Sequence, residues 1–162
     1  MTRILTARDA HFAWLLGEQE ESSGLTRPPD GIESPDVLDW VRRTTAALAR
    51  AGCPGSWLIL EGDEVVGMCS LKAPPDPRGV AEIGYGIAES RRRRGHAGAA
   101  VALIIAEISI LGLARRITAE TAIDNLPSQK VLAANGFVRV GRRHDAEDGE
   151  LVLWVRDIDP AR

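Results

Sequence analysis

The sequence predicts an α/β (α+β) fold in which a mixed, mostly antiparallel, twisted sheet carries helices on both faces. Apolar residues alternate between the spacing of a strand and the spacing of a helix along the whole chain. The Gly62-Asp63 turn joins two β-rich runs directly, which makes their pairing antiparallel. A long apolar helix after Gly95 separates two further strands, and such a crossover joins parallel neighbours.

Individual elements follow from spacing, capping and turn chemistry. We expect seven strands, at residues 3–5, 57–60, 65–71, 80–88, 117–121, 137–140 and 151–155. We expect four helices, at about residues 6–17, 36–51, 97–111 and 125–135. Thr6 is a candidate cap for the first helix and Ser34 or Asp36 for the second, whose apolar stripe is expected to include Val37. Prolines and glycines in residues 24–35 predict an irregular loop, and loops of this length are often functional.

Length and composition fit one ordinary globular protein. The chain has 162 residues, of which 44% are hydrophobic and 27% are charged. No window approaches the ~18 uninterrupted apolar residues of a membrane span, and no long apolar stretch follows the first basic residue, so neither a span nor secretion is expected. Cys53 and Cys69 lack redox or metal spacing, which favours a reduced, cytoplasmic protein.

Charge and histidine positions limit the classes of partner. A net charge of −3 argues against general affinity for nucleic acids. An RNA-binding module is nevertheless kept as an alternative, because arginines cluster at 91–94, 115–116 and 142–143. His11 and His144 belong to no arrangement of Cys, Asp or Glu that resembles a zinc site, so no metal is expected.

The most informative segment is residues 82–98, EIGYGIAESRRRRGHAG. A short strand passes into an arginine run and then a glycine-punctuated turn that opens a long apolar helix. Such a turn directs unpaired backbone N–H groups at one spot, which suits a phosphate. Alone, the arginine run would be a solvated surface and Gly95 a simple helix start. Together with the Asn-Ser and Asn-Gly-Phe patterns of residues 125–137, the segment favours an anion site.

These residues resemble a known family. Arg92-Arg-Arg-Gly95-His-Ala97 is similar to the (Gln/Arg)-x-x-Gly-x-(Gly/Ala) signature of the GNAT superfamily of acetyltransferases. Residues 81–85, Asn125-x-x-Ser128 and Asn135-Gly136-Phe137 resemble the branch that contains the ribosomal-protein N-terminal acetyltransferases. The resemblance runs from about Val80 to the C-terminus. It implies the GNAT acyl-CoA N-acyltransferase fold and a single domain over 1–162, with acceptor-side helices and first strands in 1–78 and an acetyl-CoA-binding core in 79–162.

The resemblance also implies how acetyl-CoA is bound. Amides of the turn and the positive end of the following helix would hold the pyrophosphate. The backbone of Ile87 and Glu89 would pair with the pantetheine arm between two splayed parallel strands. For His96 we expect the backbone to be used and the side chain to be variable decoration. The implied contacts are Ile87, Glu89, Arg92, Arg93, Arg94, Gly95, His96, Ala97, Gly98, Asn125, Ser128 and Lys130.

The implied chemistry is attack of an amine on a thioester. Glu82, on the strand beside the thioester, is the candidate base, and a solvated surface carboxylate is the alternative. Many relatives have a tyrosine as proton donor where this chain has Leu132, which cannot donate. Ser128 is the substitute suggested by the ribosomal-protein branch, although a hydroxyl is a poor acid and water would finish the transfer. Asn125 fits a helix cap as well as a cofactor contact.

Two glycines on the same strand leave two interpretations open. Gly84 and Gly86 either mark a bulge that lets a thioester carbonyl approach backbone N–H groups, or leave room for packing of large apolar side chains.

The acceptor is expected to be a protein N-terminus or a small-molecule amine. Trp14 and Trp40 on the first helices, and Tyr85, are candidate substrate contacts, although tryptophans in such positions are more often core or interface anchors. On a regular strand Tyr85 faces the opposite side from Glu82. A homodimer through an edge strand or the C-terminal hairpin is expected. A non-catalytic acyl-CoA sensor is a further alternative, favoured by Leu132 and opposed by Glu82.

Overall fold

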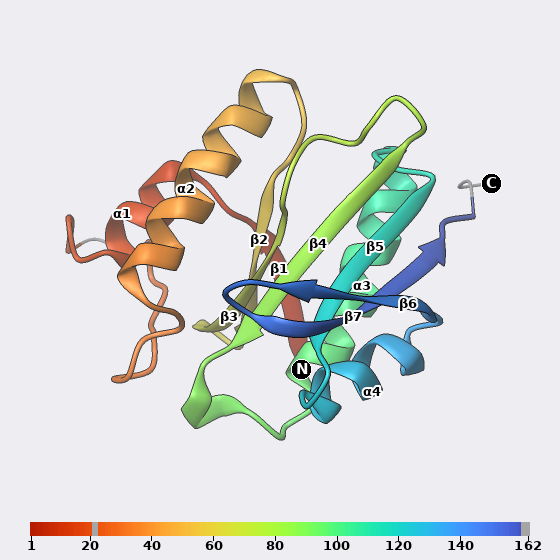
Figure 1. The fold of residues 1–162 in the computed structure, drawn as a ribbon. Coiled ribbons are helices and arrows are strands. Elements are labelled where there is room, and N and C mark those ends of the chain that lie inside the picture. The colour runs from red at the N-terminus through yellow and green to blue at the C-terminus, as the bar shows by residue number, and fades with distance from the viewer. Residues whose placement is uncertain (21–22, 160–162) are drawn as a thin grey trace.

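The computed structural model describes residues 1–20 and 23–159, which form one sheet with helices on both faces (Figure 1). The sheet order is β1-β2-β3-β4-β5-β7-β6. The strands are β1 (Thr2–Thr6), β2 (Ser56–Glu61), β3 (Glu64–Leu71), β4 (Val80–Ile87), β5 (Arg116–Ala122), β6 (Val138–Asp145) and β7 (Gly149–Asp157). The helices are α1 (Asp9–Leu15), α2 (Pro35–Arg50), α3 (His96–Leu111) and α4 (Leu126–Ala134), and a short 3₁₀ helix spans Glu89–Arg91.

The expected element order and the mixed sheet are confirmed, with corrections at two helices. Thr6 ends β1 and does not cap α1; Arg8 is the N-cap, and its backbone N–H donates to Nδ1 of His11 at 2.9 Å. Ser34 caps α2, as one of the two expected candidates. Val37 is 41% exposed, and the buried stripe of α2 includes Leu38 in its place.

Different helices cover the two faces of the sheet (Figure 1). On one face, α1 and α2 pack onto a buried cluster that includes Phe12, Leu38 and Met68. On the other face, α3 packs onto a larger cluster that includes Ile83 and Ile104. Because side chains alternate along a strand, odd-numbered residues of β4 point toward α3 and even-numbered ones toward α1 and α2.

The parallel pairing of β4 with β5 is short. It joins Val80–Glu82 to Arg116–Thr118 and is recorded no further along either strand. Beyond it, β4 stays paired with β3 as far as Ile87, while β5 stays paired with β7 as far as Ala122. The carboxyl halves of the two strands therefore separate, and the edge of β4 that faces β5 is open beyond Glu82.

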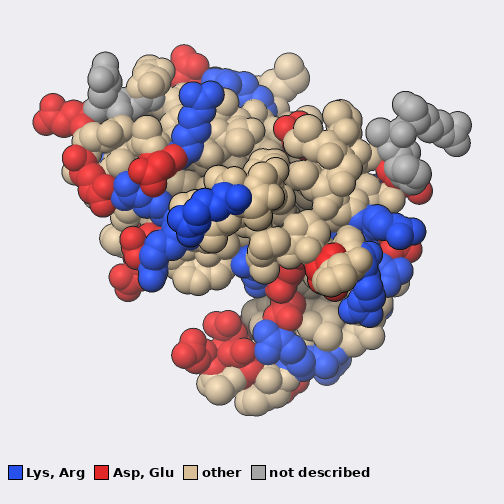
Figure 2. All heavy atoms as spheres, turned by 90° about the horizontal axis from the view of Figure 1, so that it is seen from above, with Lys and Arg blue, Asp and Glu red and all other residues tan. Residues whose placement is uncertain are grey.

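The β6–β7 hairpin crosses in front of β4 and β5 in Figure 1. Seen from above in Figure 2, it forms a lobe that stands out from the body, and a notch opens between this lobe and the side that carries α1 and α2. The hairpin is attached through β7, which pairs with β5 along seven residues. We call this notch the hairpin cleft.

The stability of the fold should depend on the buried face of α3. Ile104 is fully buried, whereas Ile110 on the same helix is 71% exposed. We expect Ile104→Ala to lower the free energy of unfolding by about 2 to 5 kcal/mol, because it removes buried methyl groups and leaves a cavity. Ile110→Ala is the matched control and should change it by less than about 0.5 kcal/mol. Urea unfolding followed by circular dichroism measures both, and equal losses would contradict the packing described.

Candidate active site

The turn before α3 leaves backbone N–H groups without helical partners. Arg93 and Gly95 have positive φ angles of 63° and 81°. Gly95 is the N-cap of α3 and makes no side-chain cap hydrogen bond, and the first N–H bonded back to the turn is that of Ala99, to the Gly95 carbonyl at 3.1 Å. The amides of residues 96–98 precede it and are free to bind an anion. No acidic residue lies in the first turn of α3.

Space around these amides is open. A Cβ atom added at Gly95 or at Gly98 would meet no atom within 4 Å. The positive φ of Gly95 favours glycine at that position. Gly98 has no positive φ and has open space around it, so neither backbone conformation nor packing requires glycine at residue 98. Ala97 between them is half-buried and small. An anion can therefore approach the backbone closely.

The four arginines of the turn differ in their contacts. Arg91 forms an ion pair with Glu64 at 2.6 Å, and its guanidinium holds the pKa of that carboxyl below its usual range. Arg92 is turned back to the strand, where its Nε donates to the Ile87 carbonyl at 3.1 Å. Arg93 and Arg94 are exposed beside the open amides. The side chain of Arg92 thus braces the turn through its bond to β4, and no such bond to the protein is seen for Arg93 or Arg94 among the described residues.

His96 differs from the expectation for its side chain. The imidazole is 4% exposed, with Nδ1 at 3.0 Å from the Thr2 hydroxyl and Nε2 at 3.3 Å from Oε2 of Glu61. It therefore anchors the start of α3 to β1 and β2, and the expectation of variable decoration is wrong. Its backbone amide stays among the open ones.

Asn135 supports the same helix end and was missed as a site residue. Its Nδ2 donates to the Gly98 carbonyl at 3.2 Å and to the Val131 carbonyl at 2.9 Å. The end of α4 is thus tied to the first turn of α3. The Asn-Gly-Phe pattern was the available signal, but a contact between two distant helix ends is not visible in sequence spacing.

The open edge of β4 presents its odd-numbered residues. The Glu82 carbonyl accepts from Lys72 and the Ala88 amide donates to Val66, so even-numbered backbone groups face β3. Ile83, Tyr85 and Ile87 therefore turn their N–H and C=O groups toward the gap beside β5. The Ile87 carbonyl already accepts a hydrogen bond from Arg92. The N–H of Ile87 is therefore the better candidate for the expected contact with the pantetheine arm. Glu89 is exposed and begins the 3₁₀ helix.

Tyr85 lies beside Ser128 and away from the hairpin cleft. The two hydroxyl oxygens are 2.7 Å apart, and the Asn125 side chain accepts from the Ser128 N–H at 3.2 Å, which confirms the helix cap. Burial raises the pKa of Tyr85, and the hydrogen bond from Ser128 partly opposes that shift. The Tyr85 side chain thus contacts α4, and a substrate contact of Tyr85 stays a prediction. Leu132 is buried and Lys130 is exposed on the same helix.

Glu82 shares the floor of the hairpin cleft with a lysine. Its Oε1 lies 2.8 Å from Nζ of Lys72, and the Lys72 chain passes over Gly84, where an added Cβ would lie 3.2 Å from its Cε. The register between β3 and β4 shows no shift along 83–87, so the bulge considered at Gly84 and Gly86 is absent. The glycines instead leave room for polar side chains above the strand.

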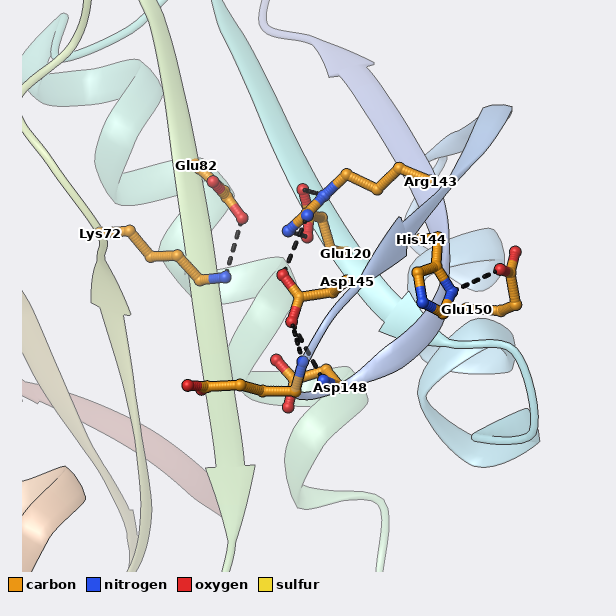
Figure 3. A network of polar contacts seen from close by, with 9 residues as sticks. Lys72, Glu82, Glu120, Arg143, His144, Asp145, Asp148 and Glu150 are labelled. Carbon is orange, nitrogen blue, oxygen red and sulfur yellow. Dashed lines mark hydrogen bonds and ion pairs between the residues drawn. The ribbon is translucent and has the colours of Figure 1, made fainter.

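The hairpin adds a wall of paired charges, shown in Figure 3. Arg143 binds Glu120 through two hydrogen bonds of 2.9 and 2.7 Å and Asp145 at 3.1 Å. Backbone N–H groups of residues 147–148, together with Arg143, lower the pKa of Asp145 to about 2. In Figure 3 these side chains and the Lys72–Glu82 pair point toward one another across the sheet. Sequence reasoning missed them because the hairpin is far from Glu82 along the chain.

The two candidate tryptophans occupy different environments. Trp14 is 7% exposed in the cluster beneath α1 and α2, with the Arg27 guanidinium 5.4 Å from its ring centroid. It takes the core position that the sequence also allowed. Trp40 is 44% exposed on α2. Of the two, only Trp40 is exposed to solvent, and its substrate contact stays a prediction.

A hollow of about 940 Å³ lies at the opposite end of the β4–β5 pair, lined in part by Val80, Arg116 and Asp157. Val80 and Arg116 begin the parallel pairing, so the paired segment separates this hollow from the glycine turn. Within residues 1–20 and 23–159, no three His, Cys, Asp or Glu side chains gather as a metal site. In the same ranges, no helix has the length and apolar composition needed to cross a membrane.

Known proteins share both sequence and fold with this chain. The family described as "Acetyltransferase (GNAT) domain" matches residues 3–138. The ribosomal-protein-serine acetyltransferase of Escherichia coli (strain K12) is 30% identical over 136 residues, or 81% of this chain and 76% of that protein. The uncharacterized N-acetyltransferase YjdG of Bacillus subtilis (strain 168) is 38% identical over 85 residues, and that match spans about half of each chain, 51%.

A solved structure agrees at the level of the fold. RimL, described as the ribosomal L7/L12 alpha-N-protein acetyltransferase in complex with coenzyme A, has a TM-score of 0.74 and 20% identity, covering 99% of this chain and 96% of that chain. The fold, the acyltransferase class and the likeness to ribosomal-protein acetyltransferases that the sequence predicts are confirmed. The chain belongs to the GNAT family of acetyltransferases.

Proposed function

We propose that the protein transfers an acetyl group from acetyl-CoA to a primary amine, with the N-terminus of a protein as the favoured acceptor. The observation that carries this proposal is the set of open amides at residues 96–98, which lies where β4 and β5 separate. Acetyl-CoA combines an anionic diphosphate with an amide-bearing arm, and the turn and the open strand edge are complementary to these two parts. The name of the Escherichia coli relative supports a protein acceptor.

Each part of the cosubstrate has candidate partners. The amides of the turn would bind the diphosphate, and the exposed side chains of Arg93 and Arg94 would add charge-assisted hydrogen bonds. The Ile87 N–H would bind an amide carbonyl of the pantetheine arm, with the backbone of Glu89 next along the chain. Asn125 and Lys130 are proposed contacts from α4. The cosubstrate supplies a thioester, whose carbonyl carbon is the site of attack.

The residues around the strand gap fit the proton transfers that the reaction needs. Glu82 would take a proton from the acceptor ammonium, directly or through water, so that the nitrogen lone pair forms the new C–N bond. The C–S bond then breaks, and the sulfur receives a proton. We propose that the hydroxyl pair of Ser128 and Tyr85, 2.7 Å apart, donates toward that sulfur. The products are an N-acetylated amine and coenzyme A.

Two alternatives are less well supported. A non-catalytic sensor was favoured by Leu132, which stands where many relatives have a proton-donating tyrosine. The Tyr85 hydroxyl lies beside Ser128, however, and is a candidate proton donor in place of that tyrosine. An RNA-binding module needs free arginines, yet three of the clustered ones form ion pairs with acidic side chains, namely Arg91, Arg116 and Arg143. A homodimer and a cytoplasmic location stay predictions.

A charge placed on the turn tests the diphosphate site. Gly98→Glu adds a carboxylate at the third helical position, where glutamate suits the helix dipole, so folding should be preserved. We expect coenzyme A affinity, measured by isothermal titration calorimetry, to fall about tenfold or more relative to Gly98→Gln, which has the same size without the charge. Equal affinities of the two variants would refute a diphosphate site at the turn.

Turnover tests the reaction itself. Coenzyme A release should be seen with acetyl-CoA and peptides that begin with serine, and it should exceed release with small amines. Glu82→Gln should lower kcat by about a hundredfold or more, because the proton acceptor is lost. Ser128→Ala should have a smaller effect, since Tyr85 and water remain. Glu107→Gln, on α3, is the control. Full turnover of Glu82→Gln at every pH would exclude Glu82 as the base.

The environment of Tyr85 can be titrated directly, because it is the single tyrosine of the chain. Burial should place its midpoint above the ordinary value of about 10. In Ser128→Ala the midpoint should rise further, since the hydrogen bond that lowers the pKa is removed. Phenolate absorbance, with circular dichroism at each pH to verify folding, gives the midpoint. A folded protein that titrates at or below the ordinary value would contradict the buried hydroxyl pair.

A further inference from the structure

Lys72 follows the last residue of β3, and its side chain lies across the neighbouring strand β4 (Figure 3). Its backbone N–H donates to the Glu82 carbonyl at 2.9 Å, so the two residues are neighbours across the strands. Its side chain passes over Gly84, where an added Cβ would lie 3.2 Å from Cε, and ends with Nζ 2.8 Å from Oε1 of Glu82. The amine of Lys72 therefore contacts the same carboxylate that we propose as the base.

The amine also lies at the beginning of the strand gap. Glu82 is the last residue of β4 that pairs with β5, and Gly84 belongs to the separated half of the strand. The side chains of Lys72 and Glu82 are 39% and 33% exposed, so both stay accessible from the hairpin cleft. An amine nitrogen next to a carboxylate, at the edge of the thioester site, is the arrangement that acetyl transfer requires of any acceptor.

Lysine is rare in this chain, which makes its position informative. The 20 basic residues counted as lysine or arginine include two lysines, Lys72 and Lys130. Lys72 is the single lysine among the ion pairs of the described residues, in which arginine or histidine is otherwise the basic partner. An arginine keeps its proton in a protein, whereas a lysine ammonium can lose one and become a nucleophile. Lys72 thus adds a transferable amine to the ion pair with Glu82.

We propose that Lys72 is a self-acetylation site, at which the chain transfers the acetyl group of its own bound acetyl-CoA to Nζ. This inference rests on the proposed acetyl transfer. Glu82 takes a proton from the Nζ ammonium, the nitrogen lone pair forms an amide bond to the thioester carbon, and the C–S bond breaks. The nitrogen loses a second proton, the sulfur gains one, and one proton is released to water. Acetylated Lys72 carries no charge, so Glu82 loses its ion-pair partner.

Peptide mapping by mass spectrometry tests the site, after incubation with acetyl-CoA that carries an isotope-labelled acetyl group and without any peptide acceptor. Label should accumulate on Lys72 about tenfold or more faster than on Lys130, which is exposed on α4, because a held amine beside a base reacts faster than a free one. Arg78→Lys is the matched control, since the Arg78 side chain is 85% exposed on the loop between β3 and β4. The amine introduced at residue 78 should react as slowly as Lys130.

Two further variants separate transfer within the protein from chemical acetylation by free acetyl-CoA. Gly98→Glu, which should weaken binding of the diphosphate, should slow labelling of Lys72 relative to Gly98→Gln and leave labelling of Lys130 unchanged. Unlabelled acetyl found on Lys72 before incubation counts as product if it is present in Gly98→Gln and reduced in Gly98→Glu. Lys72→Arg keeps a positive charge beside Glu82 but has no transferable amine. It should therefore lose the burst of coenzyme A release that matches the amount of native protein.

The rate constant for labelling of Lys72 should be independent of protein concentration, because donor and acceptor belong to one chain. A rate constant that rises in proportion to protein concentration would overturn self-acetylation, as would equal labelling of Lys72, Lys130 and the amine introduced at residue 78. A chain that acetylates peptides while Lys72 carries neither labelled nor unlabelled acetyl would overturn this inference and leave the proposed function standing. If neither Lys72 nor any peptide is acetylated, the proposed function fails with it.

Discussion

The early end of the backbone pairing between β4 and β5 is the constraint on which the rest of the site depends. Three residue pairs hold the strands together, and past Glu82 each strand is paired only on its outer side among the described residues. Backbone groups in a protein interior need partners, so an open strand edge is costly unless a ligand or water completes it. The glycine turn, the open edge of β4 and the hydroxyl pair of Tyr85 and Ser128 all border this gap.

Residues from distant parts of the chain hold the turn before α3 in place beside this gap. The side chain of His96 is buried against β1 and β2 and ties the start of α3 to these strands. Asn135 of α4 donates to the first turn of the same helix. Arg92 ties the turn back to the last residue of β4. Since these contacts use side chains and carbonyl groups, the amides of residues 96–98 are left available for an anion. The contacts that hold the turn in place thus also leave its backbone amides open.

Sequence reasoning was most successful where the signal is local. Periodicity, turn residues and caps predicted the element order, the parallel crossover after Gly95 and the cap at Asn125, because each depends on neighbours within one helix or hairpin. The buried His96 side chain and the Tyr85–Ser128 pair join segments that only the tertiary fold brings together. Thr6 was misjudged because β1 continues through it, and strand pairing overrides a local cap preference.

The attachment of the β6–β7 hairpin has a mechanical consequence for the molecule. Among the described strands, β6 pairs with β7 alone, so the outer wall of the cleft hangs from the sheet by one ladder of hydrogen bonds. Side-chain bonds between Arg143 of β6 and Glu120 of β5 add to that ladder. The contacts that position the hairpin are therefore separate from those that position α3 and the glycine turn, so a change in one set leaves the other intact.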